Sequence, residues 1–378
     1  MALIKTKLIS FLIVTTFIAT SCSQKNYNIN KDEQVAFIGS YTNSESLENE
    51  GIYYVTQNEN TGELVKGEVL ASIKNPSFLK ISPDKKTLYA VSELSGEGVE
   101  TGFLYAYIIG KENQLSFINK LPTNGTAPCH ITTNNSGNFI FVANYLGGVV
   151  MVYETLENGG LKEFQKLELD NPIKSHAHSV TLSADNKHIY IADLGNDKIW
   201  MYNFNAKEKT IQKAKVPFVK LEDGSGPRHF VIAKDGEHAY VVNELNSTIT
   251  TFNIDSDGVL QPIQNISTLP DSYHASNSAA DIHITNSGEY LYVSNRGHNS
   301  LASYKMDKKS GKLTSLGYTS TDGETPRNFA ISTNDDFLYV ANQNSGNIVS
   351  YKIDSKNGFL TPFQNLKADT PVCIEFMR

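Results

Sequence analysis

The chain has few cysteines, no excess of positive charge and almost no long apolar run. Three cysteines in 378 residues are too few for a disulfide-stabilised scaffold. The formal net charge is −7, and no basic stripe with interleaved aromatic residues occurs, which argues against a nucleic-acid partner. A Gly-x-Ser-x-Gly elbow, a phosphate-binding loop and a dinucleotide fingerprint are also missing. We therefore expect neither covalent serine chemistry nor nucleotide chemistry, and no cofactor.

The one long apolar run, residues 8–19, follows Lys5 and Lys7 near the start of the chain. It ends in Ala-Thr-Ser-Cys, which is typical of a bacterial lipoprotein cleavage site at Cys22; a plain secretory signal with an incidental cysteine is the alternative. We predict a signal peptide over residues 1–21, lipidation of Cys22 and a polar tether over residues 22–33. The run is too short for a stable spanning helix, so the lipid anchor would be the only membrane contact. The protein is then an exported lipoprotein on the periplasmic or cell-surface side of a membrane.

The rest of the chain is a repeat. The phrase apolar-aromatic-apolar-small-Asn/Asp/Ser recurs every 47 to 52 residues, and its aromatic anchors are Phe37, Tyr89, Phe141, Tyr190, Tyr240, Tyr292 and Tyr339. After each anchor comes a turn closed by an aliphatic residue, such as Asp257-Gly258-Val259-Leu260, which predicts a β-hairpin. Apolar and polar residues alternate between these markers, and no helical period competes with them. Four short antiparallel strands in each of seven repeats predict an all-β, seven-bladed β-propeller.

The two ends of the chain predict how the ring closes. Residues 35–39 begin at the second strand of a blade, and residues 370–374 copy the first strand found at residues 127–131. The C-terminal strand should therefore pair with the N-terminal blade, which makes residues 34–378 one domain and leaves no long unpaired edge. We expect a monomer. Cys129 and Cys373 fall on innermost strands of blades that are not adjacent, so buried free thiols are expected rather than a disulfide.

Histidines concentrate at one point of the repeat. Counting back 9 to 12 residues from the anchors leads to a set of positions that we predict share one register around the central channel: Phe78, His130, His178, His229, His283 and Asn328, with Cys373 as the seventh. Because the first two strands of a blade are antiparallel, the residues four places after each anchor should emerge at the same mouth. These are Tyr41, Glu93, Tyr145, Leu194, Glu244, Arg296 and Gln343.

A mouth that combines imidazole, carboxylate and guanidinium groups suits an anionic substrate and proton transfer. Arg228, Arg296 and Arg327 could bind a carboxylate, a phosphate or a developing oxyanion. Glu244 could activate a water if its surroundings raise its pKa, and His178 could share that work.

Several of these residues also have a purely structural interpretation. Some of the ring histidines could simply bond to a neighbouring blade, and Glu93 belongs to an acidic segment, residues 93–100, interpreted as a flexible, solvated lip. A metal site that includes His176-Ala177-His178 is a weaker alternative, because sevenfold spacing tends to hold ring residues apart. We predict no bound metal.

Three phrases along the chain resemble the seven-bladed propeller lactonases, a family that includes propeller-type 6-phosphogluconolactonases and fungal carboxymuconate lactonizing enzymes. The phrases are Gly226-Pro227-Arg228-His229, Tyr240-Val241-Val242-Asn243-Glu244-Leu245 and Asp281-Ile282-His283-Ile284-Thr285. The resemblance extends over essentially the whole mature chain. It implies a catalytic group of His178, Arg228, Glu244 and Arg296, and we assign His130, His229, His283 and Arg327 to substrate binding.

The resemblance implies metal-free hydrolysis of a lactone by water, with arginine stabilising the oxyanion, and we expect a 6-phosphogluconolactonase-like enzyme acting on an anionic sugar lactone. The export signal departs from the cytoplasmic members and favours a lactone without phosphate, and Leu194 predicts one apolar side to the pocket. Two other functions stay open: a non-catalytic binding or scaffold propeller at a membrane, and an intramolecular lyase that forms a lactone.

Overall fold

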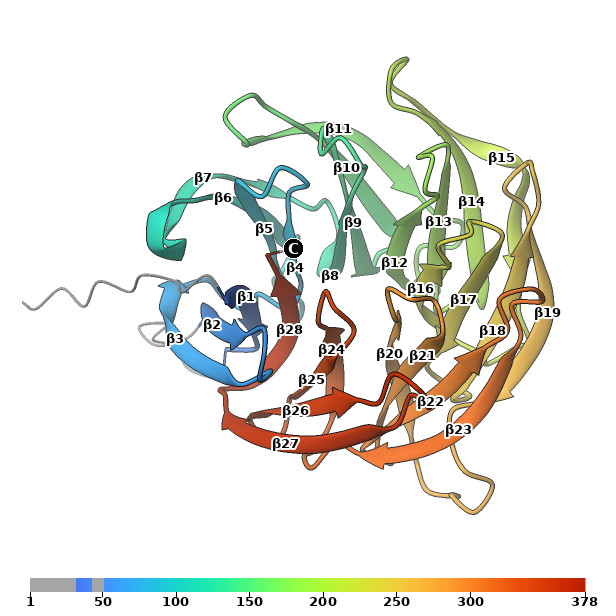
Figure 1. Ribbon diagram of the computed structural model, residues 1–378. Coiled ribbons are helices and arrows are strands. Elements are labelled where there is room, and N and C mark those ends of the chain that lie inside the picture. Colours follow the sequence, from blue (N-terminus) through green and yellow to red (C-terminus); the bar gives the residue numbers. More distant parts are fainter. Residues whose placement is uncertain (1–31, 43–50, 378) are drawn as a thin grey trace, which may run out of the picture.

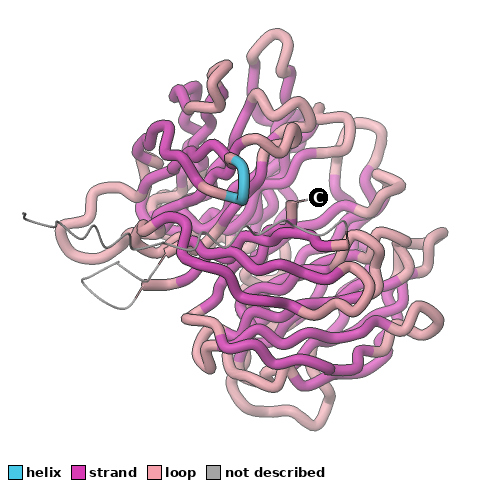
Figure 2. The backbone as a smooth tube through the Cα atoms, turned by 60° about the vertical axis from the view of Figure 1, so that its left-hand side comes forward, coloured by secondary structure: helices cyan, strands magenta, loops and turns pink. Residues whose placement is uncertain are grey.

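A computed structural model describes residues 32–42 and 51–377, and these form a ring of seven four-stranded antiparallel sheets (Figure 1). The predicted seven-bladed β-propeller is therefore confirmed. Nearly every described residue lies in a strand or in a turn between strands, and the one helical element described is a single 3₁₀ turn, η1 (Lys111–Asn113) (Figure 2). The predicted signal peptide, Cys22 and most of the tether lie outside the described residues.

The strands of each blade follow one another from the channel outward. Blade 1 contains β28 (Pro371–Phe376), β1 (Glu33–Ser40), β2 (Ile52–Asn58) and β3 (Leu64–Ala71). Blade 2 contains β4 (Leu79–Ile81), β5 (Thr87–Ser92), β6 (Phe103–Ile109) and β7 (Leu115–Pro122), and blade 3 contains β8 (Thr126–Thr133), β9 (Phe139–Leu146), β10 (Val149–Thr155) and β11 (Leu161–Glu168). Blade 4 contains β12 (Ala177–Leu182), β13 (His188–Asp193), β14 (Lys198–Asn205) and β15 (Thr210–Lys220). Blade 5 contains β16 (Pro227–Ile232), β17 (His238–Asn243), β18 (Thr248–Ile254) and β19 (Leu260–Ser267), and blade 6 contains β20 (Ser278–Ile284), β21 (Tyr290–Arg296), β22 (Ser300–Met306) and β23 (Leu313–Ser320). Blade 7 contains β24 (Pro326–Ile331), β25 (Phe337–Asn342), β26 (Asn347–Ile353) and β27 (Leu360–Lys367).

The ring closes as the repeat predicts. Strand β28, from the C-terminal end of the chain, is the innermost strand of blade 1 and pairs antiparallel with β1 (Figure 1). Cys373 lies opposite Gly39 in that pairing, so the strand occupies the register of the inner strands of the other blades. Both Cys129 and Cys373 are free and buried, as predicted.

The two sequence markers of the repeat bond to each other across neighbouring blades. The hydroxyl of each anchor tyrosine donates to the carbonyl of the turn glycine in the next blade, with distances of 3.3 Å for Tyr89–Gly159, 2.9 Å for Tyr190–Gly258, 2.7 Å for Tyr240–Gly311, 2.9 Å for Tyr292–Gly358 and 3.0 Å for Tyr339–Gly62. The last bond joins blade 7 to blade 1. The two phenylalanine anchors, Phe37 and Phe141, precede blades 2 and 4, whose turn markers, residues 112–115 and 209–211, contain no glycine. Anchor and turn are thus matched in pairs, and each pair fastens one blade to its neighbour.

The apolar core is divided among the gaps between blades. A cluster that includes Phe139, Phe141, Trp200 and Phe204 fills the space between blades 3 and 4, and comparable clusters occupy the other gaps. Each strand turns one face into each gap, so residues alternate between two clusters along a strand. The channel wall is then free to carry polar residues.

Candidate active site

The inner strands share a stricter register than a spacing of 9 to 12 residues before each anchor implies. His130 lies opposite Ala143, and Asn328 lies opposite Ala341. His130 and Asn328 are therefore equivalent positions, and each lies eleven residues before its anchor. His178 instead precedes Ser179, which lies opposite Ala192, and His283 pairs with the anchor Tyr292 itself. The prediction that four histidines share one register is therefore wrong for His178 and His283. The equivalent positions in their blades are Ser179 and Asp281.

The inner strands share a bulge near their start. In six blades the pairing of the first two strands shifts just before the ring position, which adds one residue to the channel wall. Two layers of side chains result. The upper layer, nearer the mouth, contains Ser77, Cys129, His178, Arg228, Ala280, Arg327 and Val372. The layer below it contains Phe78, His130, Ser179, His229, Asp281, Asn328 and Cys373.

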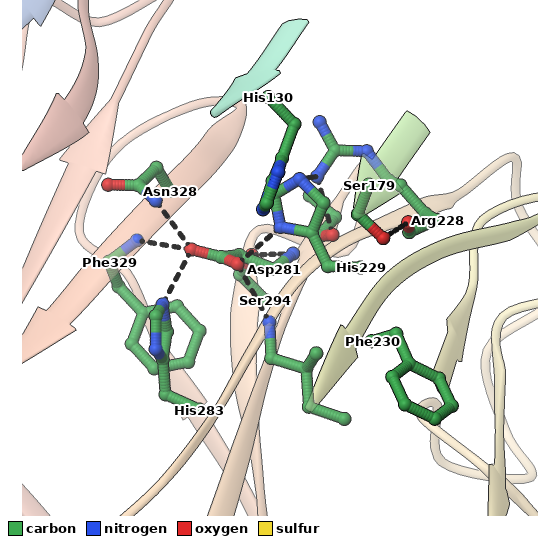
Figure 3. Close-up of polar contacts among 12 residues, drawn as sticks. His130, Ser179, Arg228, His229, Phe230, Asp281, His283, Ser294, Asn328 and Phe329 are labelled. Carbon is green, nitrogen blue, oxygen red and sulfur yellow. Dashed lines mark hydrogen bonds and ion pairs between the residues drawn. The ribbon is translucent and has the colours of Figure 1, made fainter. Parts of the chain in front are cut away.

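Asp281 is the centre of the lower layer (Figure 3). Its carboxylate accepts hydrogen bonds from His229 Nδ1 at 2.6 Å, His283 Nε2 at 2.9 Å and Asn328 Nδ2 at 2.6 Å. The backbone amides of Phe329 and Ile282 also donate to it, at 3.2 and 3.0 Å. Burial by itself would raise the pKa of Asp281, but the two histidines and these bonds hold it well below its usual value. Asp281 is therefore a buried, ionised carboxylate that joins three blades.

His229 connects Asp281 to the upper layer. Its Nδ1 donates to Asp281, so its Nε2 is the atom that faces Arg228 Nη1 at 3.3 Å. Burial, with Arg228 beside it, lowers the pKa of His229 to about 4, so the imidazole is neutral at neutral pH. The rings of His130 and His178 lie 5.5 and 5.4 Å from it, so three of the predicted histidines do meet in the channel.

Glu244 lies directly after β17 and forms ion pairs with two arginines. Its Oε2 is 2.9 Å from Arg228 Nε and 2.9 Å from Arg296 Nη2. Arg228 Nε is not aligned for a hydrogen bond to Glu244. Arg228 Nη1 donates instead to Ala280 O at 2.6 Å. Burial would raise the pKa of Glu244, but Arg296 and Arg228 outweigh it and bring the pKa below its usual value. Glu244 was expected to activate a water only if its surroundings raised its pKa, and they lower it instead. The carboxylate of Glu244 is therefore ionised at neutral pH but is not a strong base.

His178 lies within the same cluster but is almost enclosed. Its Nδ1 is 3.7 Å from Cys129 Sγ, and its ring meets that of Tyr145 edge-on at 5.5 Å. Burial, followed by the charge of Arg228, lowers the pKa of His178 well below its usual value. His176 stacks on the other side of Tyr145, with ring centres 4.5 Å apart. His178 is therefore a neutral imidazole at neutral pH.

A second acid–base cluster, which we call the distal cluster, consists of Tyr41, Glu93 and Arg327. Tyr41 donates to Glu93 Oε2 at 3.0 Å, Arg327 Nη2 is 3.7 Å from the same oxygen, and the guanidinium lies over the Tyr41 ring at 5.3 Å. The backbone of Glu93 is anchored at both ends, because its N–H donates to Asn75 O and its carbonyl accepts from Asn75 Nδ2. The interpretation of Glu93 as part of a flexible lip is therefore wrong.

Two predicted residues lie away from the mouth. His283 is two residues beyond Asp281 along β20 and lines a cavity of about 450 Å³ at the opposite end of the channel, with Lys80 and Glu375. Leu194 is 4% exposed, so it offers little apolar surface to a ligand. Among the described residues, no group of three or more His, Cys, Asp or Glu side chains is placed to hold a metal ion. The same part of the chain contains no helix suited to crossing a membrane.

The distribution of arginine in the sequence is a further signal for this site. Arginine occurs only four times in the chain, at positions 228, 296, 327 and 378, and the other basic residues are lysines. Three of the four meet at one mouth of the channel. Arginine presents a planar fork of donors that lysine cannot reproduce, so this concentration marks a site for oxygen anions. Asp281 could have been found by applying a constant offset of eleven residues before each anchor.

Comparison with known proteins gives consistent results. The family "Lactonase, 7-bladed beta-propeller" matches residues 35–376. A 6-phosphogluconolactonase of Formosa agariphila is 35% identical over 78% of this chain and 85% of its own, and one of Bacillus subtilis is 28% identical over 78% and 84%. Among solved structures, a periplasmic gluconolactonase of Pseudomonas aeruginosa is 30% identical with a TM-score of 0.85, over 91% of this chain and 99% of its own. A candidate 6-phosphogluconolactonase of Bacteroides fragilis is 34% identical with a TM-score of 0.83, over 92% and 99%.

Proposed function

The chain belongs to the seven-bladed β-propeller lactonase family, and from that premise we propose that it hydrolyses a sugar lactone at the mouth formed by Glu244, Arg228 and Arg296. The observation that carries the proposal is the double ion pair, which fixes one carboxylate between two guanidinium groups. Such an arrangement offers an acceptor for water beside a donor for a carbonyl oxygen. A scaffold propeller has no need of it.

Exposure suggests different roles for the two arginines. The side chains of Arg296 and Glu244 are 15% and 16% exposed, whereas that of Arg228 is 1% exposed. Arg296 can therefore touch a ligand, and Arg228 acts by holding Glu244 in position. Burial, with Arg228 nearby, lowers the pKa of Arg296 to about 10, so it remains charged at neutral pH.

In the proposed reaction the lactone carbonyl oxygen accepts from Arg296, and water attacks the acyl carbon. Both arginine contacts fall on Glu244 Oε2, so Oε1 can accept the proton of that water; its lowered pKa makes Glu244 a weak base, and Arg296 therefore supplies the larger part of the rate. The negative charge that develops on the carbonyl oxygen is stabilised by Arg296. Glu244 then returns that proton to the ring oxygen, which leaves as a hydroxyl when the bond to the acyl carbon breaks, and the acid that forms ionises at neutral pH. His178, which is neutral and packs against Cys129, Tyr145 and His229, has no proton-transfer role in this reaction.

The test is a pH-indicator assay of the mature domain on δ-gluconolactone and its 6-phosphate, corrected for spontaneous hydrolysis. We expect Glu244→Gln to lower kcat about 100-fold or more, and Arg296→Ala to do so by about 100- to 1,000-fold. Glu97→Gln, an exposed acid with the same change of charge, is the control and should leave kcat unchanged. Equal acid release by the wild type and both site variants would remove the proposal.

We also propose that the enzyme is exported and anchored through a lipid on Cys22. The motif at residues 19–22 supports this, and the Pseudomonas aeruginosa relative is described as periplasmic. Palmitate labelling of cells should mark the wild-type protein and not Cys22→Ala. Labelling of both, or of neither, would contradict the anchor.

A further inference from the structure

The distal cluster faces the Glu244 pair within one mouth. Arg327 occupies the same layer as Arg228, and Glu93 occupies the same position after its strand as Glu244. Cys129 lies within electrostatic reach of both carboxylates, Glu93 and Glu244, and of both arginines. The two acid–base clusters thus share one mouth, and we place the reacting carbonyl at Glu244 and the far end of the substrate at the distal cluster.

We infer that the substrate is an unphosphorylated aldonolactone, whose distal hydroxyl groups bind to Glu93 and Arg327; this rests on the proposed lactonase function. The charges of the mouth support it. Three guanidinium groups and two carboxylates leave only one positive charge in excess, which is too little for a phosphate ester. A phosphate would add a charge of about −1.5 to −2 with nothing left to balance it. Asp281, one layer deeper, adds a further negative charge.

The contacts of Glu93 also suit hydroxyl groups. Tyr41 and Arg327 both approach Oε2, and within residues 32–42 and 51–377 no group bonds to Oε1, which can accept from a substrate hydroxyl. At 3.7 Å from Glu93 the guanidinium of Arg327 is too far for a hydrogen bond, so its donors remain available to hydroxyl oxygens. Adjacent acceptor and donor groups match a pair of neighbouring hydroxyls, which both donate and accept. A phosphate, which only accepts, would meet the carboxylate of Glu93 unfavourably.

A cavity beside the distal cluster contains lysines that could instead favour a phosphate. A cavity of about 510 Å³ beside Tyr41 is lined by Lys66, Lys367 and Asp369. Lys66 is paired with Asp369 at 2.8 Å, which leaves Lys367 as the cation that a phosphate would use. Lys367→Met therefore belongs in the experiment as the variant that would reveal phosphate recognition.

The experiment measures kcat/KM for δ-gluconolactone and for its 6-phosphate with the wild type, Glu93→Gln, Glu97→Gln and Lys367→Met. We expect the wild type to prefer the unphosphorylated lactone by about tenfold or more, and Glu93→Gln to shift that ratio by about tenfold toward the phosphate ester. Glu97→Gln and Lys367→Met should leave the ratio unchanged. A wild type that prefers the phosphate ester, a Glu93→Gln variant that slows both substrates equally, or a preference that depends on Lys367 would each overturn the inference.

The outcome can be separated from failure of the proposed function. If neither lactone is hydrolysed faster than it decays in buffer, the proposed function fails, and the site can still be probed by calorimetry with gluconate and 6-phosphogluconate. Tighter binding of gluconate, weakened by Glu93→Gln and not by Glu97→Gln, would support the assignment of the distal cluster. Tighter binding of 6-phosphogluconate, or no binding of either, would overturn it.

Discussion

Asp281→Asn is the substitution that most directly tests the buried network below the mouth. Asp281 accepts from five donors, two on Oδ1 and three on Oδ2. An asparagine keeps one acceptor oxygen and turns an NH₂ group toward the other donors. If the amide oxygen takes the side with three donors, the NH₂ faces His229 and the amide of Ile282. His229 must then move its proton to Nε2, where it opposes the donor Arg228 Nη1 at 3.3 Å.

The magnitude follows from these contacts. One backbone donor, Ile282 N–H, loses its partner, and hydrogen bonds to a charged acceptor contribute about 1.5–3 kcal/mol each. The opposition between His229 and Arg228 adds to this loss, and breaking a buried ionic contact costs about 3–5 kcal/mol. We therefore expect the free energy of unfolding to fall by about 3–5 kcal/mol.

Urea unfolding at pH 7, followed by circular dichroism, measures the change. The matched control is Asp235→Asn, because Asp235 also bonds to a histidine, His238 Nδ1 at 2.8 Å, but is 36% exposed. That change should cost about 1 kcal/mol or less. A loss below about 1 kcal/mol for Asp281→Asn, or an equal loss in the two variants, would refute the view that the Asp281 network supports the channel.

Three further predictions concern acid, blade contacts and ring closure. The pKa of His229 is about 4 in the folded state and about 6.5 in the unfolded chain, so only the unfolded chain takes up a proton between these values. The free energy of unfolding should therefore fall as the pH drops below about 6.5, by roughly 2 kcal/mol at pH 5. An unchanged urea midpoint from about pH 7 to about pH 5 would contradict this. Tyr240→Phe removes the bond to Gly311 and should cost about 1 kcal/mol by the same urea assay, whereas a loss below about 0.3 kcal/mol would show that the bond contributes little. Deleting residues 370–378 removes the inner strand of blade 1 and exposes the edge of β1, so the cooperative unfolding transition should disappear; a soluble truncated protein that still melts cooperatively would show that the ring does not depend on this strand.

Much of the candidate site could be located from the sequence, because the repeat places strand ends at a common mouth. Glu244, Arg228 and Arg296 were expected there, and the structure brings them into contact. The pKa of Glu244 could not be predicted in the same way. Its direction depends on whether two guanidinium groups touch the carboxylate or merely lie near it, and that depends on side-chain positions that no sequence pattern encodes.

The sequence by itself determined the number of blades, the strand order and the closure of the ring. These depend on local features, namely alternation along a strand, turn glycines and anchor tyrosines, that recur in every repeat. Only the tertiary structure decided that two layers of side chains line the channel, because the bulge shared by the inner strands adds a residue such as Cys129 or His178 to the wall, and no pattern in the repeat marks that bulge. It also decided that Glu93 is a partner of Arg327, since the two residues are more than 200 positions apart and meet only when the ring closes.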